Sequence, residues 1–102
     1  MGSRKAKRLA PIHPGQVLME ILSEAELTVN ALAMSLRVPA NRIGAVIKGQ
    51  RGITADTALR LARYFGTSAQ MWINLQARYD LETAEDSLKE QIKREVLPRT
   101  AA

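Results

Sequence analysis

The stretch VPANRIGAVIKGQRGIT, residues 38–54, decides how this chain folds. Pro39 biases the residue before it away from helical backbone angles and itself suits a first helical position, while Gly49 suits a helix end. From residue 38 to residue 47 the apolar side chains recur at helical spacing. They are Val38, Ile43, Val46 and Ile47. The stretch therefore predicts a short helix with one apolar face and a polar rim.

Helix signals of the same kind recur on both sides of this stretch. Pro14 opens an apolar stripe, and Thr28 is a natural N-cap for the segment that follows it. Thr54 and Ser68 are natural N-caps for two further helices, the first of which should stop at Gly66. The residues of these two helices expected to face inward are Leu59, Leu61, Ala62, Phe65 and Trp72.

The rest of the chain completes an all-helical pattern. A last segment, residues 81–97, has a thin apolar stripe that ends before Pro98, and no segment alternates as a strand does. We therefore predict an all-α fold of five to six short helices. The expected parts are a flexible basic N-terminal arm at 1–12, a helical domain at 13–80, a C-terminal helix at 81–97 available to another chain, and a tail at 98–102.

Composition limits the chemistry that the chain can carry. A chain of 102 residues has room for one hydrophobic core, and the absence of cysteine excludes disulfides and thiolate chemistry. No apolar run is long enough to span a bilayer, and the basic N-terminus has no apolar stretch behind it. We expect a cytoplasmic protein that contacts no membrane and takes no small-molecule substrate.

Charge is distributed unevenly along the chain. Residues 1–79 carry 11 of the 15 Lys and Arg and 4 of the 10 acidic residues, so their net charge is +7. Residues 80–102 carry a net charge of −2. A basic body suggests a polyanionic partner, although a basic surface kept for solubility gives the same totals.

The two helices on either side of the central turn meet the packing demands of a helix-turn-helix. Ala33 is small where the helices would cross, and Val38 is apolar in the turn. Ile43 points back toward the first helix, with Val46 and Ile47 behind it. In such a unit the second helix enters the major groove of DNA. Two ordinary packed helices with a solvated face would satisfy the same apolar pattern.

The polar rim favours DNA over a solvated face. Asn41 can bind adenine through two hydrogen bonds, Arg42 can do the same to guanine, and small residues let a helix lie close to the base edges. The expected base contacts are Ala40, Asn41, Arg42, Gly44 and Ala45. The expected phosphate contacts are Thr28, Arg37, Lys48, Gln50 and Arg51.

Other chemistry has little support. His13 is the only histidine and lies between two prolines in an expected linker, so we interpret it as structural. Glu20 and Glu24 are one turn apart on a surface helix, where acids are usually solvated. The acidic residues 80–86 lack the spacing of a calcium loop, and GQRG at 49–52 follows a helix rather than a strand. We expect no catalytic residue, no metal and no cofactor.

Apolar residues near the C-terminus are hard to bury in a monomer. A stripe this narrow is typical of helix-on-helix association. We expect a dimer seam formed by Tyr79, Leu81, Leu88 and Ile92.

Longer motifs give a family resemblance. They are IHPGQVLMEIL at 12–22, NRI at 41–43, GQRGITADTALRLARYFGTS at 49–68 and MWINLQ at 71–76. With them the chain resembles the HigA-type (VapI-type) antitoxins, within the XRE helix-turn-helix family of the phage lambda and 434 repressors. Members often carry Gly where this chain has Arg37. Because Asn41 is the one strong hydrogen-bonding reader among the family's positions, specificity would lean on Arg42 and on DNA shape.

The resemblance implies a function and two partners. It implies a lambda-repressor-like, homodimeric repressor that binds double-stranded operator DNA of its own operon, and that neutralises a RelE-like ribonuclease toxin of the HigB type. Because such a toxin is usually basic, we expect its contact to include one of two acidic groups, either residues 80–90 or Glu20, Glu24 and Glu26, packed around apolar side chains. The alternatives are a stand-alone XRE-type regulator without a toxin and a protein-only inhibitor that does not bind DNA.

Overall fold

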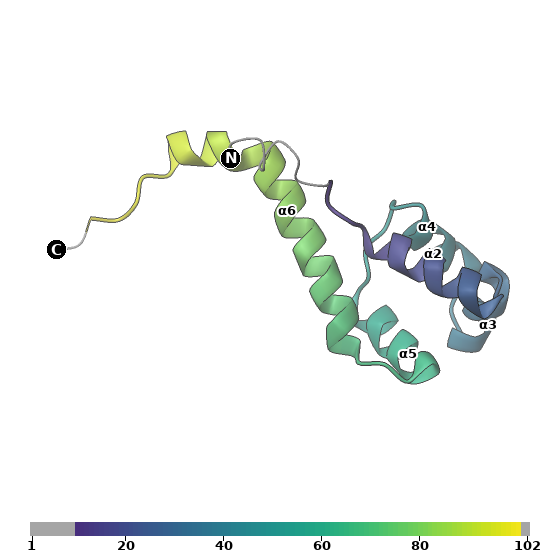
Figure 1. Ribbon diagram of the computed structural model, residues 1–102. Helices are drawn as coiled ribbons and strands as arrows, with labels where there is room; N and C mark the ends of the chain where they lie inside the picture. Colours follow the sequence, from purple (N-terminus) through teal and green to yellow (C-terminus); the bar gives the residue numbers. More distant parts are fainter. Residues whose placement is uncertain (1–9, 101–102) are drawn as a thin grey trace.

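The structure is a computed structural model that describes residues 10–100, and this part contains five helices and no strand (Figure 1). They are α2 (Pro14–Ala25), α3 (Val29–Leu36), α4 (Ala40–Ile47), α5 (Ala55–Phe65) and α6 (Ala69–Glu95). The predicted all-α class is confirmed. Of the predicted N-terminal arm, residues 1–9 lie outside the described residues, as do residues 101–102 of the tail.

Side-chain caps begin three of the helices, as their sequences predict. The hydroxyl oxygens of Thr28, Thr54 and Ser68 accept hydrogen bonds from the backbone N–H three residues on, at 3.0, 3.4 and 3.1 Å. Each bond satisfies one of the N–H groups that a helix leaves free in its first turn. Gly66 ends α5 with φ +73°, and Gly49 follows α4 with φ +76°.

Two predicted boundaries are wrong. Pro39 is the cap of α4 rather than its first residue. The segments expected as a fifth helix and a separate C-terminal helix form one continuous helix, α6. Side-chain pairs one turn apart support the helix at the expected boundary: Gln76 donates to Asp80, the last residue before it, at 2.9 Å, and Arg78 donates across it to Glu82 at 3.1 Å. Such pairs support a helix where the sequence offers no breaker.

The core lies where α2 to α5 meet the first half of α6. Its buried apolar side chains are Leu18, Leu22, Leu32, Ala33, Leu36, Ile43, Val46, Ile53, Ala58, Leu61 and Trp72. The inward placement of Trp72 is therefore confirmed. That of Leu59 is wrong, since its side chain is 63% exposed. Leu59 precedes the buried Leu61 by two residues, which puts it on the opposite side of the helix, and Ala58 takes the inward position.

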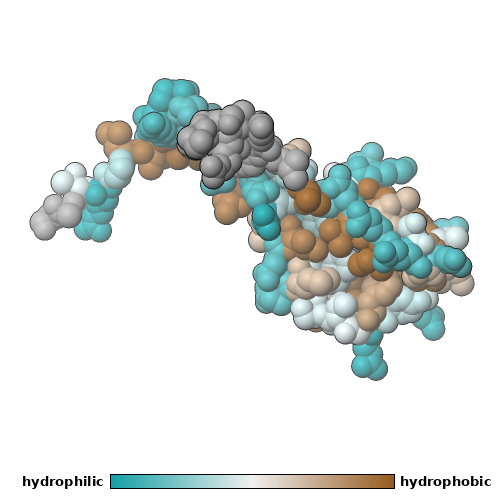
Figure 2. Space-filling view, viewed as in Figure 1, coloured by the Kyte–Doolittle hydropathy of each residue, from teal (hydrophilic) through white to brown (hydrophobic). Residues whose placement is uncertain are grey.

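The second half of α6 projects from this body (Figure 1). This half of the helix changes direction (Figure 1), and within it the hydroxyl of Ser87 donates to the carbonyls of Thr83 and Ala84 at 3.2 and 3.4 Å. Bonds of this kind often bend helices. Hydrophobic side chains remain exposed along the projecting part (Figure 2); they are Leu81, Leu88 and Ile92, followed by Val96 and Leu97 just after the helix.

Candidate nucleic-acid interface

Helices α3 and α4 form the expected helix-turn-helix around a three-residue turn. Arg37 ends α3 in the left-handed region, with φ +61°, and the N–H of Val38 bonds to the carbonyl of Ala33 at 3.0 Å. This conformation usually takes glycine because a side chain costs about 1–2 kcal/mol there. The turn therefore keeps the glycine-type geometry although the residue is arginine, and the Arg37 side chain is exposed.

The packing expected between the two helices is confirmed. Ala33 is buried, Val38 is half-buried in the turn, and Ile43 and Val46 are fully buried. Ile47 is half-buried beside them. The opposite side of α4 is consequently the side that a partner can reach.

The reachable face of α4 carries small and polar side chains. Ala40, Asn41 and Lys48 are exposed, and Gly44 and Ala45 are half-buried. At 100° per residue, the directions of Asn41, Gly44, Ala45 and Lys48 share one side of the helix. Three of the five predicted base contacts, Asn41, Gly44 and Ala45, therefore lie on one face. The other two, Ala40 and Arg42, lie at opposite edges of this face, and the Arg42 side chain is 24% exposed.

Gly44 has no role inside the fold that would demand glycine. It lies within a regular helix, and a Cβ placed on it would meet no atom within 4 Å. Glycine inside a helix is about 0.5–1 kcal/mol less favourable than alanine. A helix face that is bare at this position admits close approach by a partner outside the chain.

The HPG motif at the start of α2 has a structural explanation. His13 is buried, not part of a linker as predicted, and its Nδ1 accepts a hydrogen bond from the N–H of Gly15 at 2.9 Å. A Cβ on Gly15 would collide with the backbone carbonyl of Val46, so glycine lets α2 approach α4. The interpretation of His13 as structural is confirmed. Its ring meets Tyr79 edge to face at 4.8 Å, so Tyr79 is half-buried within the chain itself.

The loop after α4 presents the basic residues expected to contact phosphate. Lys48, Gln50 and Arg51 are exposed, and neither basic residue has an ion-pair partner among residues 10–100. The side chain of Gln76 in α6 holds this loop, because its Oε1 accepts the N–H of Ile53 at 2.7 Å. The other two predicted phosphate contacts are exposed as well: Thr28 at the start of α3 and Arg37 at its end.

Residues of α5 that the sequence did not single out also reach the interface. Asp56 accepts a hydrogen bond from Arg42 at 2.6 Å and one from Arg60 at 3.0 Å. The bond from Arg42, followed by that from Arg60, holds the pKa of the Asp56 carboxyl below its usual value. Arg60 in turn donates at 2.8 Å to the carbonyl of Leu36, which is the last residue of α3. Contacts between positions 14 and 24 residues apart give no local sequence signal.

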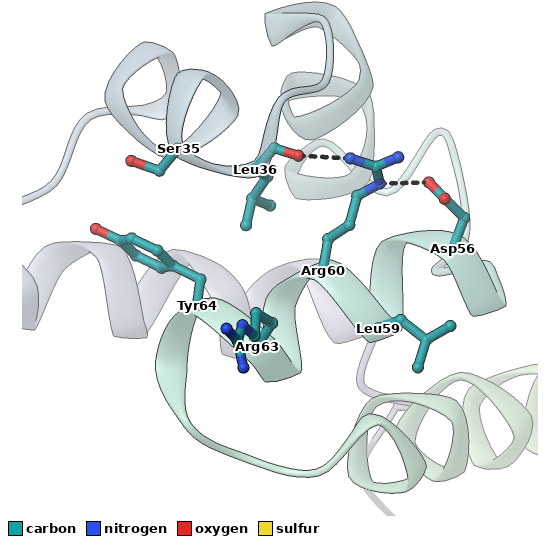
Figure 3. A pocket seen from close by; sticks show the side chains of 7 residues that line it. All are labelled: Ser35, Leu36, Asp56, Leu59, Arg60, Arg63 and Tyr64. Carbon is teal, nitrogen blue, oxygen red and sulfur yellow. Dashed lines mark hydrogen bonds and ion pairs between the residues drawn. The ribbon is translucent and has the colours of Figure 1, made fainter.

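A groove of about 590 Å³ opens on this side of α5 (Figure 3). Its lining includes the exposed Leu59 and Tyr64, together with Ser35, Leu36, Asp56, Arg60 and Arg63. Among residues 10–100 no group of three or more His, Cys, Asp or Glu side chains could hold a metal ion. No helix of this part is long and apolar enough to cross a bilayer.

Comparison with known proteins fits this geometry. The helix-turn-helix family pattern matches residues 18–72. Virulence-associated protein I of Dichelobacter nodosus is 55% identical over 75 residues, which are 72% of this chain and 69% of that protein. The chain belongs to the helix-turn-helix family that includes the HigA antitoxins.

Solved structures of HigA antitoxins are similar over nearly the whole chain. The HigA-family addiction module antidote protein of Coxiella burnetii has a TM-score of 0.85 and 46% identity, covering 89% of this chain and 100% of that one. The Pseudomonas aeruginosa antitoxin HigA, solved with the higBA promoter, has a TM-score of 0.85 and 47% identity, covering 88% and 99%. The likeness therefore includes α6, most of which lies beyond the matched family pattern.

Proposed function

We propose that this protein is a sequence-specific transcriptional repressor that binds operator DNA through α4 and acts as the antitoxin of a toxin–antitoxin pair. The bare, polar face of α4 carries the proposal. Asn41 stands on it beside Gly44 and Ala45, where small side chains allow the helix to lie against base edges. The relatives are consistent, since one of them is a HigA antitoxin solved with its promoter.

Phosphate contacts would come from the ends of the same unit. Lys48, Gln50 and Arg51 follow α4, while Thr28 begins α3 and Arg37 ends it. Contacts of this kind fix the register of a protein on the duplex without reading sequence. Base reading would rest on Asn41, on the small residues around it and on Arg42.

Operator binding of this kind is expected to involve two copies. One short recognition helix reads few bases, and helix-turn-helix dimers dock two of them on half-sites about 34–36 Å apart. The exposed apolar stripe of α6 supplies a candidate seam, formed by Leu81, Leu88 and Ile92. Tyr79 lies at its inner end, against His13.

The partner proposed for the antitoxin role is a HigB-like ribonuclease toxin. Such an enzyme is expected to be basic, so its contact should use acidic groups of this chain. Those groups are exposed Glu20, Glu24 and Glu26 near α2, and the acidic residues of 80–90 on α6. Both groups lie on elements other than α4, so a complex would leave the DNA-binding face free. We place the protein in the cytoplasm, because both proposed partners, operator DNA and a ribonuclease toxin, are there.

Selection of DNA from a random duplex library tests the DNA-binding half. The wild-type protein should enrich one sequence class, and Asn41→Ala should lower affinity for it by about 1–3 kcal/mol and relax preference at one base pair. Enrichment of no sequence would leave the protein-only inhibitor as the better reading. An unchanged preference in the variant would place base reading elsewhere.

Co-expression with the small gene next to its own tests the antitoxin half. The neighbour alone should arrest growth, and the pair should grow and co-purify as a complex that still retards the selected duplex. A neighbour that is harmless alone and does not co-purify would reject the antitoxin role and leave the stand-alone regulator.

A further inference from the structure

The carboxylate of Asp56 links helices α3, α4 and α5 at the edge of the face proposed to bind DNA. Asp56 lies in the first turn of α5. Its Oδ2 accepts a hydrogen bond from Nη1 of Arg42, in α4, at 2.6 Å and another from Nε of Arg60 at 3.0 Å. Arg60 also donates Nη1 to the carbonyl of Leu36, at the end of α3, at 2.8 Å (Figure 3). A single chain of polar contacts thus runs from the helix-turn-helix turn through α5 to the edge of α4.

The geometry leaves Arg42 able to contact another group. An arginine carries five N–H donors, and the contact with Asp56 uses one of them. Its side chain is 24% exposed and lies beside the row formed by Asn41, Gly44 and Ala45. A guanidinium held on one side by a carboxylate can therefore offer its remaining edge to DNA in a fixed direction.

The contacts of Asp56 are not explained by stability alone. Its side chain is 52% exposed, and exposed ion pairs contribute little to folding. Such ion pairs can instead fix the conformation of a long side chain before it binds. A free arginine loses rotamer freedom when it binds, and a pre-ordered one loses less. Without this carboxylate, Arg42 would lose the bond that fixes its direction, and Arg60 would keep only its bond to the Leu36 carbonyl.

We propose that Asp56 is a positioning residue for sequence recognition, which holds Arg42 and the end of α3 in the arrangement that the operator requires. This proposal rests on the proposed DNA-binding function and names a residue that determines its specificity. It makes an unusual prediction for an acidic residue near DNA. Removal of a negative charge should raise affinity for any duplex through charge alone, whereas loss of positioning should lower affinity for the selected duplex only.

The experiment compares two duplexes and a matched pair of variants. The duplexes are the one that the wild-type protein selects from a random library and a scrambled one of the same composition. Asp56→Ala is compared with Glu95→Ala, which removes an exposed acid from the last turn of α6. Affinities are measured for both duplexes, and thermal unfolding gives the folded fraction of each variant.

Asp56→Ala should reduce the ratio of the two affinities by about three- to tenfold, the loss expected when one long side chain is no longer pre-ordered. Glu95→Ala should leave the ratio unchanged. Arg60→Gln should reduce the ratio by itself, and its effect should not add fully to that of Asp56→Ala because both break one chain of contacts.

A ratio that Asp56→Ala leaves intact would overturn the proposal. If both affinities rise together, Asp56 acts only as a repelling charge; if both fall together, it acts only on the folded fraction. If the protein does not bind DNA in a sequence-specific way at all, the wild-type protein itself will show equal affinities for the two duplexes, a result that differs from every outcome above.

Discussion

The side chain of Gln76 accepts the backbone N–H of Ile53 at 2.7 Å, and so ties α6 to the loop that follows the recognition helix. The same amide donates to Asp80, one turn further along α6, at 2.9 Å. Gly52 leaves room for this contact, because a Cβ there would lie 3.0 Å from the Gln76 side chain and would push it aside slightly. The loop that carries Arg51 is therefore held from a helix more than 20 residues away.

Replacement of Gln76 by leucine should release this loop. The variant leaves the half-buried N–H of Ile53 without an acceptor, which costs about 1–3 kcal/mol. Chemical denaturation should show that loss, and affinity for random and selected DNA should fall together because phosphate contacts are disordered. Gln91→Leu, on the exposed end of α6, is the control and should change neither quantity. Equal stabilities of the two variants would contradict the assigned bond.

Two glycines should respond in opposite ways to alanine. Gly15→Ala forces a methyl group against the Val46 carbonyl and should destabilise the fold by about 1–3 kcal/mol or more, since backbone must move. Gly44→Ala meets no atom and should stabilise it by about 0.4–1 kcal/mol. The methyl group on the α4 face should nevertheless weaken binding to the selected duplex. Thermal unfolding and DNA titration of both variants give the comparison, and undiminished binding by Gly44→Ala would place the duplex farther from this face.

The helix caps could be predicted from the sequence, whereas the contacts between helices could not. Caps depend on residues three positions apart, so Thr28, Thr54 and Ser68 were visible in the sequence. The contacts of Asp56 with Arg42 and of Gln76 with Ile53 depend on how helices pack, and 14 or 23 residues separate the partners. No pattern within one segment predicts them.

The same limit explains the errors in burial and in boundaries. Leu59 is as apolar as Leu61, and only the register of α5 against its neighbours decides that it faces outward. His13 looks like part of a linker until the fold brings Tyr79 against its ring. A helix-breaking residue was needed to divide α6, and the sequence around Asp80 offers none.

Acid should remove the contribution of Asp56 to stability. Hydrogen bonds from Arg42 and then Arg60 lower the pKa of its carboxyl in the folded chain below the usual 3.8. A lowered folded pKa means that the stabilisation is complete above the unfolded value and is lost as the pH falls through the folded one. Urea unfolding from pH 7 to strongly acidic solution should therefore show a small difference between the wild type and Asp56→Ala that disappears at the acidic end. A difference that is constant over the whole range would contradict the ion pair as its source.

Charge at the loop after α4 should set the salt dependence of DNA binding. Lys48 and Arg51 are exposed and unpaired within the described residues, so each can release a counterion from the duplex. Replacing either by alanine should weaken selected and random DNA about equally and lower the magnitude of the salt slope by about one. Titrations at several salt concentrations measure it. A slope equal to that of the wild type would mean that the side chain stays in solvent when DNA binds.

The exposed stripe of α6 should join two copies of the chain. Leu81, Leu88 and Ile92 are 62%, 41% and 49% exposed, and their spacing places them on one side of the helix. Leu88→Asp puts a charge in the middle of this stripe, where a seam would bury it at high cost. Sedimentation should show a shift from dimer to monomer, and affinity for a two-half-site operator should fall while affinity for one half-site is kept. Thr83→Asp adds the same charge on the opposite side of α6 and should remain dimeric. A dimer that survives Leu88→Asp would place the seam elsewhere, and the groove beside Leu59 and Tyr64 is then the surface to test next.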